Sequence, residues 1–360
     1  MRKLVFFALA AIFLSCNESA KKIQFFSAEN QSIKYSGRHA TESGSVALIG
    51  SASSVQTKVY GDSVALVFES PENHHYVAVE LNDKYLGRYR VKNDTLSFGL
   101  PNKDAANGLK VYKDTEAANS DLIFIGLQAD KIEAPSEEDR LTIEFIGNSI
   151  TCGMGADSSK IGCDEEEWYD QHNAYMAYGP RVARALKANF RLNCVSGMGM
   201  YRNWNDEDQP VMPNVYDNKR LNADSNEKAD FSGKSPEIVS IALGTNDLSY
   251  GDGEKERKAF DQEKFVNNYI DFVKHIFKLY PNTQVALLSS PMVGEKEKPV
   301  LEQSLEEVKS HFENNRVAVF KFDTMNLQGC GNHPNLQDHR EMAQALIPFY
   351  RNLLSENTIE

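Results

Sequence analysis

The chain has 360 residues, with 39 Lys and Arg against 51 Asp and Glu, so its formal net charge is −12. This acidic balance excludes an electrostatic grip on nucleic acid or on an anionic membrane surface, which requires clustered Lys and Arg. Hydrophobic residues make up 41% of the chain, so a globular core can form, and the length favours two domains.

The first residues are typical of an export signal. Two basic residues precede an unbroken apolar run, Leu4–Leu14, which is too short to span a bilayer. Cys16 follows the small residue Ser15, as in the lipobox of bacterial lipoproteins. Residues 1–16 therefore predict a lipoprotein anchored through Cys16, or an ordinary cleaved signal in which this cysteine is incidental. Both predict a secreted or cell-envelope location, and lipidation would explain the odd cysteine among five.

Residues 22–134 predict an antiparallel β-sandwich or jelly roll. Short segments rich in Val, Tyr, Phe and Thr recur about every 8–12 residues, separated by turn pairs such as Gly-Asp and Asn-Asp. The predicted strands are Ser45–Ile49, Val55–Tyr60, Ser63–Glu69, Tyr76–Leu81, Tyr85–Val91, Leu96–Leu100, Gly108–Tyr112 and Leu122–Leu127.

After a polar linker that begins at Pro135, residues 140–356 alternate apolar runs with amphipathic stretches. The runs are Leu141–Ile146, Arg191–Val195, Ile238–Leu243, Gln284–Ser289 and Val317–Phe322, and the helical stretches are Tyr175–Ala188, Phe260–Tyr280, Val300–Asn314 and Asp338–Leu353. This alternation predicts an α/β domain whose parallel sheet is covered by helices on both faces. Active groups of such sheets gather beyond the carboxyl ends of the strands.

A serine and two hydrogen-bond donors follow the first three runs. The hydroxyl of Ser149 can be held on a tight turn, although it is a nucleophile only if a base takes its proton. Gly197 can bring a backbone N–H close to a developing oxyanion, and Asn246 offers a side-chain N–H to the same centre. Ordinary turns at Ser149 and Gly197, and an Asx turn or helix cap made by Asn246 or Asp247, are the competing interpretations.

The candidate base is His333, found by elimination among eight histidines. It lies in a loop that follows the last predicted strand, whereas the others fall in the β region, in helical stretches or in a polar loop. Metal binding by His333 and His339 is the competing idea. The loop contains neither an HExxH motif nor a cysteine pair at zinc spacing, so we predict no metal and no cofactor.

Together, these four blocks and their order resemble the SGNH (GDSL-type) hydrolase superfamily. The resemblance implies a three-layer α/β/α domain in which Ser149 is the nucleophile and His333 the base. It also implies an oxyanion hole made by the N–H of Ser149, the N–H of Gly197 and the side chain of Asn246.

Two departures narrow the resemblance. Asn148 stands where the superfamily usually has Asp, and Cys330 stands three residues before the histidine, where an orienting Asp is usual. A neutral cysteine cannot stabilise an imidazolium as a carboxylate does. Carbohydrate esterase family 2 is similar on this point, with a Ser–His dyad whose ring a backbone carbonyl can orient, behind an N-terminal jelly roll. Membership implies removal of acetyl groups from plant cell-wall polysaccharides such as xylan and glucomannan.

The expected partner is an acetylated polysaccharide or oligosaccharide, with no nucleic acid and no membrane contact beyond the N-terminal lipid anchor. Four aromatic residues flank the catalytic blocks and are candidates for stacking on sugar rings, namely Trp168, Tyr169, Tyr201 and Trp204, with Trp204 foremost. Burial as loop anchors is the competing interpretation for each. Cys152 and Cys163 lie in one loop and are compatible with a disulfide or with free thiols.

Two other functions remain open from sequence alone. A lipase or thioesterase of the same superfamily would need an apolar groove. The loops near Gly197 contain Trp and Asn, which disfavours such a groove. A surface glycan-binding lipoprotein with a vestigial hydrolase part is the non-enzymatic alternative. The presence of all four motif residues, Ser149, Gly197, Asn246 and His333, disfavours it.

Overall fold

The structure, a computed structural model, describes residues 23–136, 139–207, 209–312 and 316–356. The predicted export signal, Cys16 included, lies outside the described residues. No helix in the part that the structure describes is long and apolar enough to cross a membrane.

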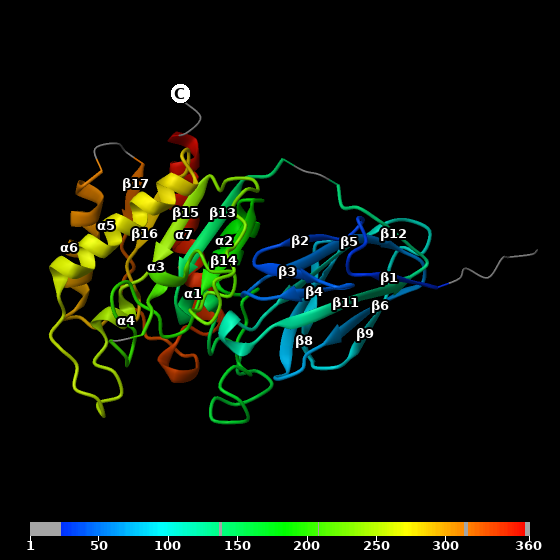
Figure 1. The fold of residues 1–360 in the computed structure, drawn as a ribbon, viewed down its shortest axis with the longest axis horizontal. Helices are drawn as coiled ribbons and strands as arrows, with labels where there is room; N and C mark the ends of the chain where they lie inside the picture. Colours follow the sequence, from blue (N-terminus) through cyan, green and yellow to red (C-terminus); the bar gives the residue numbers. More distant parts are fainter. Residues whose placement is uncertain (1–22, 137–138, 208, 313–315, 357–360) are drawn as a thin grey trace, which may run out of the picture.

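Two antiparallel sheets form the N-terminal part (Figure 1). One has the order β3-β4-β11-β6-β9 with β1 beside β11, and the other β12-β5-β10-β7-β8 with β2 beside β5. The strands are β1 (Gln24–Ser27), β2 (Lys34–Ser36), β3 (His39–Glu42), β4 (Ser45–Leu48), β5 (Ser54–Tyr60), β6 (Ser63–Glu69), β7 (His75–Leu81), β8 (Lys84–Val91), β9 (Thr95–Gly99), β10 (Asn107–Lys113), β11 (Leu122–Ala129) and β12 (Lys131–Glu133). A 3₁₀ turn, η1 (Ala117–Asn119), precedes β11.

Alternating side chains hold this sandwich together. Along β6, Val64, Leu66 and Phe68 are buried between more exposed neighbours, so one face of the strand packs on the opposite sheet. All eight predicted strands are present. The four that the pattern missed, β1, β2, β3 and β12, have only three or four residues each, too few for a visible alternation.

The C-terminal part is built on a parallel sheet of order β14-β13-β15-β16-β17. Its strands are β13 (Thr142–Gly147), β14 (Asn189–Cys194), β15 (Ile238–Ala242), β16 (Gln284–Leu288) and β17 (Val317–Phe320). The helices are α1 (Ser149–Cys152), α2 (Tyr178–Ala185), α3 (Met212–Val215), α4 (Thr245–Leu248), α5 (Gln262–Leu279), α6 (Lys298–Ser310) and α7 (Leu336–Glu356), and η2 is a 3₁₀ turn (Cys330–Asn332).

Helices cover both faces of this sheet, which makes three layers. On β13, Phe145 packs with residues of α2 and α7, whereas Ile146 belongs to the cluster formed with α5 and α6. The strand is buried throughout, as expected for a central parallel strand. The predicted α/β class with a parallel sheet, preceded by a β-rich part, is confirmed.

Buried polar contacts fasten the sandwich to the α/β part. The guanidinium of Arg38, which is buried, donates to Asn193 Oδ1 at 2.6 Å and to the carbonyls of Tyr216 and Asn218. At the same interface, Tyr175 N donates to Asp114 Oδ1 at 2.9 Å. Buried polar groups that lose such partners are costly, so the two parts are held in one relative placement.

Candidate active site

Ser149 lies just beyond the carboxyl end of the interior strand β13, as the first residue of the short helix α1. Asn148 caps this helix because its Oδ1 accepts from Ile150 N at 3.2 Å. Asn148 therefore has a structural role, and the serine side chain is left at the edge of the sheet with 6% of its surface exposed.

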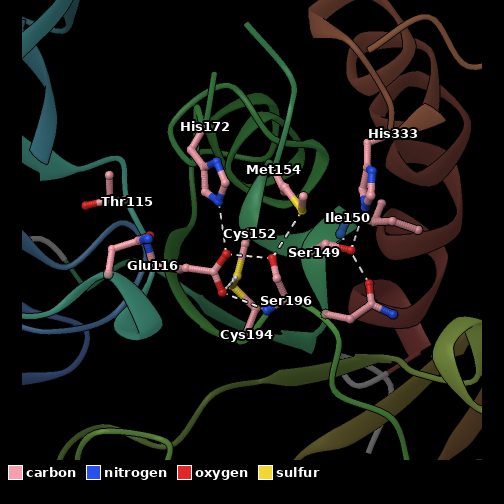
Figure 2. Close-up of polar contacts among 12 residues, drawn as sticks. Thr115, Glu116, Ser149, Ile150, Cys152, Met154, His172, Cys194, Ser196 and His333 are labelled. Atoms are coloured by element: carbon pink, nitrogen blue, oxygen red, sulfur yellow. Dashed lines mark hydrogen bonds and ion pairs between the residues drawn. A yellow bond between two sulfur atoms is a disulfide. The ribbon is translucent and has the colours of Figure 1, made fainter. Parts of the chain in front are cut away.

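The structure brings Ser149 and His333 together, although they are 184 residues apart (Figure 2). Ser149 Oγ lies 2.8 Å from His333 Nε2, and His333 Nδ1 lies 3.0 Å from the carbonyl oxygen of Gly331. A carbonyl only accepts, so Nδ1 carries the proton and donates it, and Nε2 is left to accept from the serine hydroxyl. A main-chain carbonyl thus occupies the orienting role that a carboxylate has in a triad.

The environment of His333 keeps its ring neutral. Burial lowers the pKa of His333 from its ordinary value of 6.5, and this outweighs the hydrogen bond to Gly331, which acts in the opposite direction. Because a general base must be unprotonated, the active form is the one present above this pKa.

We therefore expect ester hydrolysis to remain active into mildly acidic solution. The value of kcat/KM should fall only as pH drops through the His333 pKa, with its midpoint below 6.5. Rates for a nitrophenyl acetate between about pH 4 and pH 8 measure this fall in kcat/KM. The rate of Ser149→Ala at each pH is subtracted as the hydrolysis that does not use the nucleophile. A midpoint above 6.5 would contradict the depressed pKa.

Two disulfides brace the catalytic loops. Cys152, at the end of α1, is bonded to Cys194, at the end of β14, with Cα atoms 5.6 Å apart. Cys163 is bonded to Cys330, in η2 just before His333, with Cα atoms 5.0 Å apart. Both possibilities that the sequence left open, a Cys152–Cys163 bond and free thiols, are therefore wrong, because each cysteine bonds to one that is distant in sequence.

Removal of the Cys163–Cys330 bond should reduce both stability and rate. Its sequence separation is 167 residues, for which chain entropy predicts a loss of up to about 5 kcal/mol in the free energy of unfolding. We expect Cys163→Ser/Cys330→Ser to lower the melting temperature and kcat. Cys152→Ser/Cys194→Ser opens a loop of only 42 residues, so we expect it to lower the melting temperature by less. An unchanged melting temperature and kcat in the first variant would contradict the bracing role.

The three predicted oxyanion donors follow β13, β14 and β15, which are neighbours in the sheet. The N–H groups of Ser149 and Gly197 donate to no protein acceptor within the described residues. Asn246, in α4, uses one side-chain hydrogen to donate to the Met198 carbonyl at 2.7 Å, which leaves the other free. This arrangement suits an oxyanion on a carbonyl attacked by Ser149.

Asp247 holds the loop that carries Gly197. Its fully buried carboxylate accepts from the N–H groups of Met200, Tyr201 and Arg202 at 2.9, 2.8 and 3.2 Å. A Cβ on Gly199 would lie 2.6 Å from Asp247 Oδ2, so this close approach requires glycine. Sequence reasoning considered Asp247 only as a local cap and missed its long-range role.

The four candidate aromatic residues divide into two pairs. Trp168 and Trp204 are 46% and 45% exposed, and Trp204 N donates to the carbonyl of Gly197. Tyr169 is buried, and Tyr201 packs on Phe260 and accepts from Asp261 N at 3.0 Å. The prediction of an exposed stacking surface is therefore wrong for Tyr169, whereas Tyr201 is partly buried and its role in sugar binding stays a prediction.

His333 and His339 have separate partners. His339 lies in α7, is fully buried, and its Nδ1 accepts from Tyr178 N at 3.2 Å. Burial lowers the pKa of His339 to about 3. Among the described residues, no group of three or more His, Cys, Asp and Glu is placed to hold a metal ion.

Comparison with known proteins matches residues 143–346, more than half of the chain, to the GDSL-like lipase/acylhydrolase family. An acetylxylan esterase/glucomannan deacetylase of Cellvibrio japonicus is 28% identical over 305 residues, 81% of either protein. A solved family two carbohydrate esterase from the same organism superposes with a TM-score of 0.81 at 22% identity, covering 93% of this chain and 98% of that one. A Clostridium thermocellum family two esterase, solved with cellohexaose, has a TM-score of 0.76 at 25% identity, covering 90% and 99%. The chain belongs to the GDSL-like lipase/acylhydrolase family, as the order of its strand-end motifs predicts.

Proposed function

We propose that this protein is a carbohydrate O-acetyl esterase that acts through a Ser149–His333 dyad. The observation that carries the proposal is the 2.8 Å contact between Ser149 Oγ and His333 Nε2, with the ring oriented by the Gly331 carbonyl. The relatives of this chain named as acetylxylan esterases support the same substrate class.

Acylation begins when the Ser149 oxygen attacks the acetyl carbonyl. His333 Nε2 takes the hydroxyl proton, and the carbonyl oxygen becomes an oxyanion held by the N–H groups of Ser149 and Gly197 and by Asn246. Collapse of this intermediate breaks the ester bond, and His333 returns the proton to the departing sugar oxygen. Acetyl-Ser149 remains.

Deacylation repeats these steps with water. Water gives a proton to His333 as it attacks the acetyl-enzyme, the same donors hold the second oxyanion, and Ser149 leaves with the proton restored. Acetate is released. An ester already has a good electrophilic carbonyl, so the steps use only groups of this chain.

The substrate that fits the surroundings is an acetylated polysaccharide or oligosaccharide. Trp168 and Trp204 are half-exposed, and Trp204 is hydrogen-bonded through its backbone to Gly197, beside the reacting carbonyl. Large aromatic faces suit sugar rings, whose C–H faces are apolar. We further propose a secreted or cell-envelope location with a lipid at Cys16, which the two disulfides support because they belong to oxidising compartments.

Acetate release from a panel of acetylated xylan, glucomannan and cello-oligosaccharides tests this function. We expect release from at least one of them and a faster reaction with acetyl than with octanoyl nitrophenyl esters. Preference for the octanoyl ester would indicate a lipase. Retardation on the polysaccharides in affinity electrophoresis, without acetate release, would indicate a glycan-binding protein.

A further inference from the structure

A buried carboxylate from the sandwich domain contacts the loop that carries Gly197, the predicted oxyanion donor. Glu116, which precedes the 3₁₀ turn η1, is fully buried and lies beside His172 and Ser196 (Figure 2). Ser196 directly precedes Gly197, and His172 comes from the loop between α1 and α2. The cluster therefore joins two parts of the chain that the sequence analysis treated separately.

Glu116 accepts three hydrogen bonds from Ser196 and His172. Its Oε2 accepts from Ser196 N at 2.6 Å, and its Oε1 accepts from Ser196 Oγ at 2.5 Å and from His172 Nε2 at 3.0 Å. Burial acts to raise the pKa of Glu116, but the hydrogen bonds from His172 and Ser196 outweigh it and leave the pKa below its ordinary value. The side chain is therefore an ionised acceptor.

This Ser–His–Glu cluster is not a second nucleophilic site. The hydroxyl of Ser196 and the ring of His172 both donate to the carboxylate, so no histidine nitrogen accepts from the serine hydroxyl. A catalytic triad needs the histidine between the serine and the acid, whereas here the acid lies between the other two.

Other residues of the sandwich hold the backbone of Glu116 in place. The ammonium of Lys113 is fully buried and donates to the carbonyls of Ile49, Glu116 and Ser120 at 2.6, 2.9 and 2.8 Å. The side chain of Asn119 accepts from Glu116 N at 3.1 Å. These contacts hold the backbone of residues 113–120 and therefore the position of the carboxylate.

We propose that Glu116 is a positioning residue of the esterase, which aims the Gly197 N–H at the oxyanion. By holding both the N–H and the hydroxyl of Ser196, it fixes the residue whose peptide bond carries that N–H. Gly197 has a φ of +79°, and its far side is fixed by Trp204 N and by Asn246, which donates to the Met198 carbonyl. The sandwich domain thus contributes to transition-state binding.

The inference rests on the proposed esterase activity and is tested with the whole protein. Loss of an oxyanion donor costs about 10²–10³ in kcat, so we expect Glu116→Ala to lower kcat by about 10²-fold with little change in KM. Methylboronic acid is the second probe. It adds to Ser149 Oγ, whose proton passes to His333, and the tetrahedral anion occupies the oxyanion hole. Its Ki should rise by a factor similar to the fall in kcat.

Two milder variants and one control separate positioning from folding. Glu116→Gln still accepts from Ser196 N, and His172 can accept from the new amide by changing tautomer, so we expect a smaller loss with little change in melting temperature. Ser196→Ala removes one of the three hydrogen bonds and should also give a partial loss. Glu69→Gln makes the same chemical change at an exposed site of the sandwich and should match wild type.

The outcomes are distinguishable. Parallel changes in kcat and boronate Ki in folded Glu116→Gln and Ser196→Ala support the positioning role. Wild-type kcat and boronate Ki in both variants, beside an active wild type, overturn it and leave the esterase function intact. A wild type that hydrolyses no acetyl ester overturns both.

Discussion

Ser149→Ala is expected to lower kcat for acetyl-ester hydrolysis by at least about 10³-fold, without lowering the melting temperature. The change removes the one oxygen that lies 2.8 Å from His333 Nε2 and adds no heavy atom, so nothing clashes in the folded protein. Release of nitrophenol from an acetyl ester gives the rate, and thermal unfolding followed by circular dichroism gives the stability.

Three companion variants make this experiment more specific. His333→Gln keeps a polar side chain but no base, and should lose a similar factor, while the double variant should be no worse than either because the two groups act as one unit. Ser310→Ala removes an exposed hydroxyl at the end of α6 and should behave as wild type. Substantial activity in folded Ser149→Ala would refute the nucleophile assignment.

Asn246→Ala is the second large effect that we expect, a fall of about 10²–10³ in kcat with a much smaller change in KM. The amide donates to a charge that exists only in the transition state, so its loss affects the reaction more than ground-state binding. Rates measured across substrate concentrations separate the two constants.

Asn246 also supports the Met198 carbonyl, and a control must account for that contact. Asn205→Ala removes an amide from the neighbouring loop, where it bonds to Asp252, and should leave kcat nearly unchanged. If Asn246→Ala raised KM and left kcat intact, the residue would be a substrate-binding group and not an oxyanion donor.

The sequence pattern predicts the main site residues because the carboxyl ends of parallel strands all lie at one edge of the sheet. Ser149, Gly197 and Asn246 follow β13, β14 and β15, which are adjacent in the sheet, so their strand ends must meet. Hydrophobic periodicity also predicts the long helices, since Phe265, Tyr269, Val273 and Ile276 line the buried face of α5.

What the sequence misses depends on docking between distant segments. Glu116 lies in the sandwich and reaches Ser196 only because the sandwich packs on the α/β part, and no local pattern encodes that contact. Cysteine pairing is likewise decided by where loops meet, so Cys152 and Cys163, which are neighbours in sequence, have different partners. The burial of Tyr169 has the same origin, because a loop aromatic is exposed or covered according to which distant segments pack on it.

The carbonyl of Gly331 that orients His333 belongs to the main chain and is present whichever residue occupies the position. A scan of side-chain substitutions therefore cannot delete this group, and among the described residues no acidic side chain is hydrogen-bonded to His333. An evolutionary route from dyad to triad would place Asp at position 330, the usual site of the acid. That step would also break the bond to Cys163 and leave its thiol unpaired. In this protein, gaining a carboxylate and keeping the covalent brace are mutually exclusive.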